Sequence, residues 1–303
     1  MNKKEIVSIK INEKLKDKIE NQYKSFKEEN SNEYIVFFAK KNGTSITIYV
    51  NKKNEYKVTF IGTNALKEAR LWDENAEIAT SKNKLKNAHW LNLDDQIGSD
   101  EVGTGDFFGP ICVAASLVRK SDIAYLKSLG VDDSKKLTDE KIKELGKILI
   151  NKFPYSQLSL ENEKYNKLHD EGINLNEMKT KMHNQVLLNL KNKYHIDNIF
   201  VDQFLEKDKY YAYLSDTKDI VSNINFKTKG ESYFPSVAVA SIIARYSFLQ
   251  KMEKLSDKYK MDIPFGASTK VNNFAKKFIK TYGIDELNKI VKKNFANYKE
   301  IIK

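Results

Sequence analysis

Residues 98–110 read Gly-Ser-Asp-Glu-Val-Gly-Thr-Gly-Asp-Phe-Phe-Gly-Pro, which places two adjacent carboxylates before a glycine-rich segment. The apolar run at 111–118 predicts a buried strand, so we expect Asp100 and Glu101 at the edge of a core. Because successive strand residues point to opposite faces of a sheet, these two acids should have different roles. Adjacent carboxylates in a partly apolar setting favour a bound cation. An ordinary turn is the alternative for this segment taken alone.

Two later segments of the chain each add one acid. Residues 196–204 form an apolar run that Asp202 interrupts near its end, where a parallel strand of an α/β fold presents ligands. Glu231 stands just before residues 233–260, which are rich in alanine, serine and isoleucine at their start and predict a helix. Four carboxylates without a cysteine or histidine companion favour Mg²⁺ or Mn²⁺ over zinc, because hard cations prefer carboxylate and water oxygens.

These motifs closely resemble those of the bacterial ribonuclease HIII family, which belongs to the type 2 ribonucleases H. The resemblance covers nearly the whole chain and rests on residues 100–110, 133–137 and 236–245 and on the strand that carries Asp202. It implies cleavage of the RNA strand of RNA/DNA hybrids with two divalent metal ions, leaving 5′-phosphate and 3′-hydroxyl ends. The catalytic, metal-binding acids that it implies are Asp100, Glu101, Asp202 and Glu231.

Two positions separate this family from its sister family, ribonuclease HII. Glu231 stands where ribonuclease HII usually has Asp, and Thr104 stands where it typically has Arg. An enzyme of the HII type, which excises single ribonucleotides from duplex DNA, is the first alternative, although it usually lacks an N-terminal domain like residues 1–85. A noncatalytic hybrid-binding protein is the second alternative. It can dispense with one acid, whereas this chain has all four.

The resemblance also implies substrate contacts in three places. Backbone atoms of Gly103, Thr104 and Gly105 are expected to read the 2′-hydroxyl group, which distinguishes RNA from DNA. Phosphate contacts are expected from Ser134, Lys135 and Lys136, with a loop cap and a solvated charge pair as the alternative. In the N-terminal domain the candidates are Lys40, Lys41, Tyr49 and Lys57. Lysines there can neutralise phosphates without reading sequence, and solubilising lysines with core aromatic rings are the alternative.

Two domains are predicted, at residues 1–85 and 86–303. In the first, residues 1–30 have apolar side chains near the helical period and predict a charged amphipathic helix. Three runs rich in β-forming residues follow, at 34–40, 45–50 and 56–61. The resemblance implies that this domain is a small α+β domain similar to half of a TATA-binding protein, and that it holds the hybrid.

The second domain alternates predicted strands and helices. This order fits a ribonuclease-H-like α/β fold, a mixed sheet with flanking helices on both faces. Its last part, 271–299, is predicted to be helical, like a long segment at 176–194 that contains His183. We interpret His183 as a satisfied histidine at a helix interface in preference to a catalytic one.

The net charge of +11 over 303 residues fits a polyanionic partner, although lysine-rich solvated surfaces are common. Residues 1–90 carry 18 basic and 12 acidic side chains and therefore more than their share of this charge.

No run approaches the ~20 apolar residues of a membrane span, and the first residues lack the pattern of a secretory signal. We therefore expect a cytoplasmic protein, acting as a monomer on an RNA/DNA hybrid duplex, with no membrane and no required protein partner. The single cysteine, Cys112, is expected to be a buried inert thiol.

Overall fold

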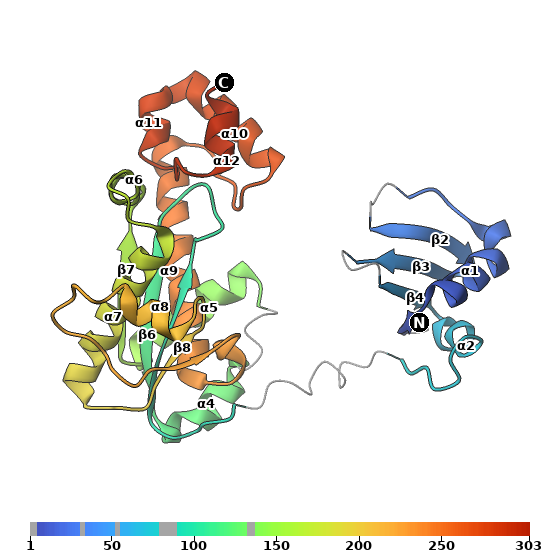
Figure 1. Ribbon diagram of the computed structural model, residues 1–303, viewed down its shortest axis with the longest axis horizontal. Coiled ribbons are helices and arrows are strands. Elements are labelled where there is room, and N and C mark those ends of the chain that lie inside the picture. Colours follow the sequence, from blue (N-terminus) through green and yellow to red (C-terminus); the bar gives the residue numbers. More distant parts are fainter. Residues whose placement is uncertain (1–4, 31–33, 52–54, 79–89, 132–136) are drawn as a thin grey trace. The chain divides into compact units, whose positions relative to one another are not determined.

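The computed structural model of the chain (Figure 1) describes residues 5–30, 34–51, 55–78, 90–131 and 137–303. The chain divides into two compact units, Met1–Asn87 and Ala88–Lys303. Three of the predicted phosphate contacts, Ser134, Lys135 and Lys136, lie outside the described residues.

The N-terminal unit is an antiparallel four-stranded sheet with helices packed on one face. Its strands, in the spatial order β1-β4-β3-β2, are β1 (Glu5–Ile11), β2 (Ile35–Lys41), β3 (Thr44–Val50) and β4 (Tyr56–Gly62). Its helical segments are α1 (Glu13–Gln22), a 3₁₀ turn (Lys24–Phe26) and α2 (Ala65–Arg70). The three predicted strands are confirmed, and the small α+β architecture with them.

The helix predicted over residues 1–30 is wrong in its first part. Residues Glu5–Ile11 form strand β1, and the helix begins only after Asn12, whose side chain accepts a hydrogen bond from the backbone N–H of Leu15. Alternate residues of β1, such as Val7 and Ile9, are buried against the helices. Burial of every second residue is typical of a half-buried strand. Pairing with β4 holds these residues in the extended conformation.

The second unit is built on a mixed five-stranded sheet in the order β7-β6-β5-β8-β9. Antiparallel pairing joins β5 (Gln96–Val102), β6 (Ile111–Val118) and β7 (Tyr155–Leu160). Parallel pairing joins β5 to β8 (Ile199–Asp202) and β8 to β9 (Asn225–Lys227). The helices are α4 (Ile123–Ser128), α5 (Asp139–Lys152), α6 (Asn162–Asp170), α7 (Leu175–Tyr194), α8 (Lys207–Ala212), α9 (Pro235–Tyr259), α10 (Thr269–Tyr282), α11 (Ile284–Asn288) and α12 (Ala296–Ile301).

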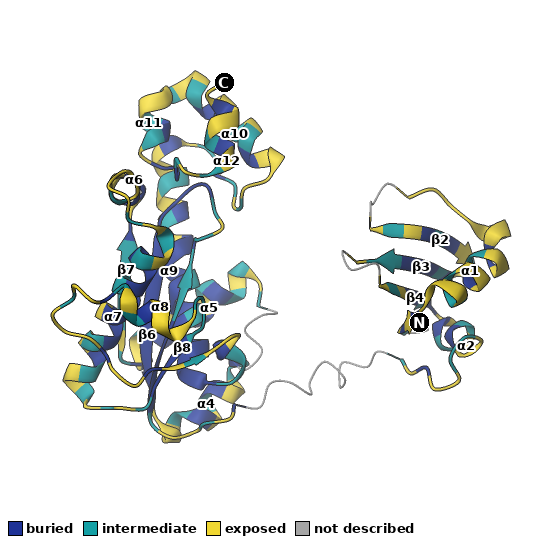
Figure 2. Cartoon of the chain, in the orientation of Figure 1, coloured by how far each residue is buried: buried dark blue, intermediate teal, exposed yellow. Residues whose placement is uncertain are grey.

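Helices cover both faces of this sheet. On one face α5 and α9 pack over Ala114 and Val118 of β6. On the other face α7 packs over Val113, Ala115 and Leu117 of the same strand. Strand β6 is buried along its whole length, and Figure 2 shows it in the dark blue centre of the unit. The predicted ribonuclease-H-like mixed sheet with flanking helices is therefore confirmed, and Cys112 is buried within it.

The C-terminal helices gather at one end of α9 (Figure 1). The segment predicted as helix at 271–299 spans parts of three of them, and Gly283, with a φ of 84°, ends the first, α10. Their apolar core also takes in Phe107 and Phe108, so the glycine-rich segment after β5 packs against this end of the molecule. Among the described residues, no helix is long and apolar enough to cross a membrane.

Candidate active site

Asp100 and Asp202 come from neighbouring parallel strands. The ladder between β5 and β8 pairs Ser99 with Val201, so the next residue on each strand is one of these two acids. Asp202 is the last residue of β8 and Asp100 lies two residues before the end of β5, near the edge where parallel sheets commonly present functional groups. The parallel pairing of β5 with β8 therefore brings together two acids that are about one hundred residues apart in the chain.

Glu231 reaches the same place from the 3₁₀ turn η5 (Gly230–Ser232), directly before α9. The backbone N–H of Gly230 donates a 2.7 Å hydrogen bond to Oδ1 of Asp202, which fixes this turn on the end of β8. A Cβ atom at Gly230 would lie only 3.3 Å from the Cα of Asp202. The absence of a side chain there lets the turn approach the strand and places Glu231 beside the two aspartates.

Asp100 is the acid most affected by this gathering of negative charge. Burial raises the pKa of its carboxyl group well above the usual value, and the negative charges of Glu101, Asp202 and Glu231 raise it further. A 2.7 Å hydrogen bond from the backbone N–H of Glu101 opposes this shift but does not cancel it. The site therefore concentrates negative charge that a bound cation would neutralise.

Glu101 points to the opposite face of β5, toward α7. Lys179 Nζ lies 2.9 Å from its Oε1 atom, and His183 Nε2 lies 3.0 Å from its Oε2 atom. Burial alone would raise the pKa of Glu101, but the hydrogen bonds and charges of His183 and Lys179 outweigh it and lower this pKa to about 2. Glu101 is thus an ionised, doubly paired carboxylate.

Sequence reasoning missed Lys179 and interpreted His183 only as an interface histidine. The structure places both against a predicted catalytic acid, with side-chain exposures of 7% and 0%. A signal for this pair was present, since the two residues are four positions apart and so share one face of α7. A lysine and a histidine on the buried face of a helix require a buried partner.

The donor set fits a hard divalent cation. All four predicted ligands are carboxylates, and three of them raise the pKa of the fourth through their charge. In their present orientations, however, no three His, Cys, Asp or Glu side chains of the described segments form a group that would hold a metal ion. A cation at this site would therefore require some of the carboxylates to turn toward it.

The segment after β5 is held in one conformation around Gly103. This glycine has a φ of 94°, and a Cβ atom there would lie 2.2 Å from the carbonyl oxygen of Pro110. Gly105, by contrast, is exposed, and a Cβ atom there would meet nothing within 4 Å. Thr104 between them is partly exposed. Among the residues predicted to contact the 2′-hydroxyl group, Gly103 is thus fixed in conformation and the backbone of Gly105 is accessible.

Lys292 holds the far side of this segment. Its buried ammonium group donates to the backbone carbonyl oxygens of Asp106 and Gly109, at 2.8 and 2.6 Å. Burial lowers the pKa of Lys292 to about 8, against the opposing charge of Asp106. The carboxylate of Asp106 in turn accepts a 2.6 Å hydrogen bond from the backbone N–H of Gly266. The glycine-rich segment is therefore anchored to the C-terminal helical region.

The N-terminal candidates divide between the two faces of their sheet. Lys41 lies on the helix-covered face, 3.2 Å from Glu68, and its ammonium group is 5.4 Å from the ring centre of Tyr23. These contacts favour a structural role for Lys41. Lys40, the preceding residue, is exposed and pairs with Glu28 at 2.7 Å.

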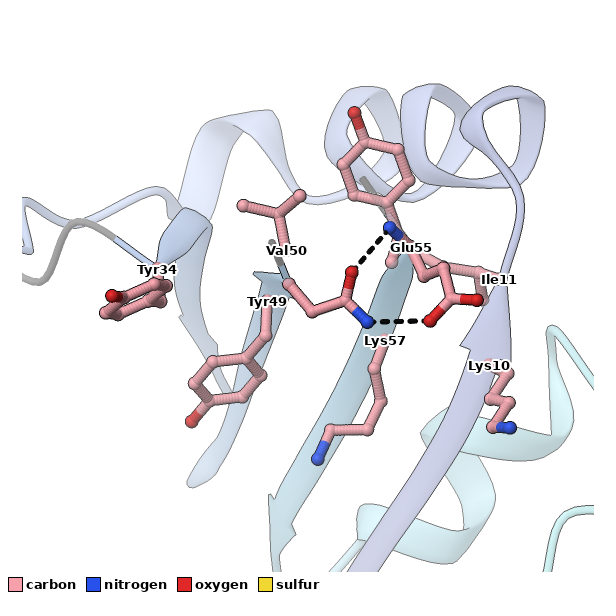
Figure 3. A pocket seen from close by; sticks show the side chains of 9 residues that line it. Lys10, Ile11, Tyr34, Tyr49, Val50, Glu55 and Lys57 are labelled. Atoms are coloured by element: carbon pink, nitrogen blue, oxygen red, sulfur yellow. Dashed lines mark hydrogen bonds between the residues drawn. The ribbon is translucent and has the colours of Figure 1, made fainter. Parts of the chain in front are cut away.

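Tyr49 and Lys57 face each other across the β3–β4 ladder, with the lysine ammonium 5.5 Å from the ring centre. They line a pocket of about 680 Å³ (Figure 3). Lys10 and Tyr34, which the sequence prediction did not include, line it together with Tyr56. The structure thus adds a second lysine and two further tyrosines to the predicted pair.

Comparisons with known proteins identify the relatives of this chain. A family model described as Ribonuclease HII matches residues 97–298, and a model described as a domain of unknown function matches residues 6–85. The chain is 39% identical to Ribonuclease HIII of Bacillus cereus, with 96% of each protein covered. It is 42% identical to Ribonuclease HIII of Bacillus mycoides, with 86% of each covered. The crystal structure of Bst-RNase HIII in complex with Mn²⁺ is 35% identical, with 98% of each chain covered and a TM-score of 0.69.

Proposed function

This chain belongs to the ribonuclease HIII family and is a ribonuclease H, and we propose that it cuts the RNA strand of RNA/DNA hybrids as an endonuclease. The observation that carries this proposal is the gathering of Asp100, Asp202 and Glu231 beside an anchored glycine-rich segment. A hydrolase of phosphodiesters needs concentrated negative charge to hold cations, and a fixed surface to hold the nucleic acid strand.

For the metal centre we propose Asp100, Glu101, Asp202 and Glu231 as ligands of Mg²⁺, with Mn²⁺ as a substitute. The Mn²⁺ complex of Bst-RNase HIII supports a divalent metal. Two such ions, when bound, supply activation of a water molecule and stabilisation of the departing 3′ oxygen, which leaves 5′-phosphate and 3′-hydroxyl ends. The chain contributes the placement of the acids, through the β5–β8 ladder and the hydrogen bond from Gly230 to Asp202.

For substrate recognition we propose two surfaces. In the catalytic unit, the backbone of Gly103, Thr104 and Gly105, which is most accessible at Gly105, contacts the ribose 2′-hydroxyl group. In the N-terminal unit, Lys57 and Lys40 neutralise phosphates, and Tyr49 packs against the sugar-phosphate chain. The open pocket that Tyr49 and Lys57 line, with Lys10 as a further cation, supports this role.

One cleavage experiment tests the proposed function. An end-labelled RNA/DNA hybrid and a DNA duplex that contains one ribonucleotide are each incubated with Mg²⁺ and with EDTA. We expect Mg²⁺-dependent cleavage of the hybrid, into products with 3′-hydroxyl ends that a polymerase can extend. Preference for the duplex with one ribonucleotide would favour an enzyme of the HII type, and cleavage of neither substrate would contradict the proposal.

A further inference from the structure

The two oxygens of the Glu101 carboxylate each have one basic partner. Lys179 takes Oε1 and His183 takes Oε2, and the lysine, the histidine and the glutamate are all largely shielded from water. Two hydrogen bonds from separate donors fix both the position and the rotation of a carboxylate. A single surface ion pair does not restrict it in this way.

The two basic groups are themselves held in place. The ring centre of Phe204, two residues after Asp202, lies 3.8 Å from the Lys179 ammonium group and 5.1 Å from the centre of the His183 ring. On the other side, Nδ1 of His183 lies 2.8 Å from the hydroxyl oxygen of Ser99. Because a carboxylate only accepts hydrogen bonds, Nε2 of His183 donates to Glu101.

We propose that Lys179 and His183 are positioning residues, which orient the Glu101 carboxylate for metal ligation, and that Lys179 is also its internal counter-ion. This proposal rests on the proposed function. The lysine places a positive charge close to the group that must accept a divalent cation, so it weakens metal binding through repulsion. Together with His183, it also holds the Glu101 carboxylate in one orientation. Lys179 therefore reduces metal affinity while it maintains the geometry needed for turnover.

The test is the substitution Lys179→Met, which keeps the length of the side chain and removes its charge. We expect kcat for hybrid cleavage to fall by about 10- to 100-fold, with the KM for hybrid changed by less than about twofold. We expect Mn²⁺ to bind the hybrid-free variant roughly tenfold more tightly by calorimetry, because the repulsion is gone. The variant Lys179→Arg, which restores the charge, should recover part of kcat and the original Mn²⁺ affinity.

The control is Lys181→Met, on the same helix. Lys181 is 35% exposed and pairs with Glu177 and Asp216, away from Glu101, so neither kcat nor Mn²⁺ affinity should change. A purely structural role for Lys179 would lower kcat and Mn²⁺ affinity together. That outcome, or an unchanged kcat in Lys179→Met, would overturn the proposal.

A double-mutant cycle keeps the test decisive if Lys179→Met folds poorly. Repulsion between the Lys179 charge and a cation does not require the Glu101 charge, so Lys179→Met should also tighten Mn²⁺ binding in a Glu101→Gln background. An unchanged Mn²⁺ affinity in that background would contradict the proposal. Mn²⁺ calorimetry does not depend on cleavage, so a failure of the proposed function and a failure of this inference give different results.

Discussion

Asp100 and Glu101 are consecutive residues of β5, yet the two faces of the strand give their carboxylates opposite environments. On the α9 side Asp100 lies among other acids, and its pKa is raised. On the α7 side Glu101 lies between a lysine and a histidine, and its pKa is lowered to about 2. On the α9 face the acids repel one another, and a bound cation would reduce that repulsion. On the α7 face the Glu101 carboxylate is already paired with basic side chains.

The largest effect is expected on the repulsive side, from Asp202→Asn. An amide ligates a hard cation poorly, so the hybrid-cleavage rate should fall by about 10³-fold or more. The amide oxygen can still accept the hydrogen bond from Gly230, so the fold should persist, as measured by circular dichroism. Asp216→Asn is the matched control, because Asp216 is 68% exposed and pairs with Lys181. A rate for Asp202→Asn within tenfold of the wild type would remove Asp202 from the metal centre.

On the paired side, Glu101→Gln should lower the free energy of unfolding by about 3 kcal/mol near neutral pH, because it leaves a buried lysine without its counter-ion. The pKa of Glu101 lies below the ordinary 4.5, so this stabilisation is present above pH 4.5 and is lost as the pH falls toward about 2. The stability difference between the wild type and Glu101→Gln should therefore shrink over that range. Urea denaturation in EDTA measures it, and a difference independent of pH would argue against the pairing.

The substitution Asp100→Asn should act in the opposite direction on stability. It removes one charge from the repelling group, so in EDTA it should raise the free energy of unfolding by on the order of 1 kcal/mol. Mg²⁺ should then raise the melting temperature of the wild type more than that of the variant. Differential scanning fluorimetry with and without Mg²⁺ provides both readings. A destabilised Asp100→Asn protein in EDTA would show that the repulsion is already compensated.

The smallest effect is expected on hybrid binding by the N-terminal sheet, where Lys57 and Lys41 have different surroundings. Lys57→Ala should weaken hybrid binding in EDTA and reduce the slope of log affinity against log salt by about 1, as expected for one lost phosphate contact. Lys41→Ala should leave that slope unchanged, because Lys41 is paired with Glu68 on the helix-covered face. Fluorescence anisotropy at several salt concentrations measures both variants. Equal slopes for the two variants would assign Lys57 to a structural role.

The sequence pattern predicted the strands that pair with their neighbours in the chain. The three strands from 34 to 61 are bounded by turn residues, and Asn42 and Gly43 both adopt the positive φ of a tight hairpin turn. The first strand could not be recognised, because its apolar residues fit both periods and only β4, about fifty residues later, decides between them. The sequence also indicated four acids beside apolar runs as metal ligands, and this ligand set stays a prediction.

The partners of Glu101 could not be predicted in the same way. Lys179 and His183 lie 78 and 82 positions further along the chain, and nothing local ties α7 to β5. Their contact depends on how the helix packs over the sheet, which in turn depends on apolar residues throughout the unit. The sequence pattern predicts the chemistry of an acid pair, and tertiary packing decides which acid is neutralised.

The clamp formed by Lys292 has a consequence for the order of folding. Its acceptors, the carbonyl groups of Asp106 and Gly109, are synthesised more than 180 residues before it. Long-range contacts of this kind form late, because the chain entropy of a large loop must be overcome first, and during synthesis the lysine does not yet exist. We therefore expect the glycine-rich segment to stay unanchored on the nascent chain. The segment that we propose contacts RNA would then be anchored only after the ribosome has read the codon for Lys292.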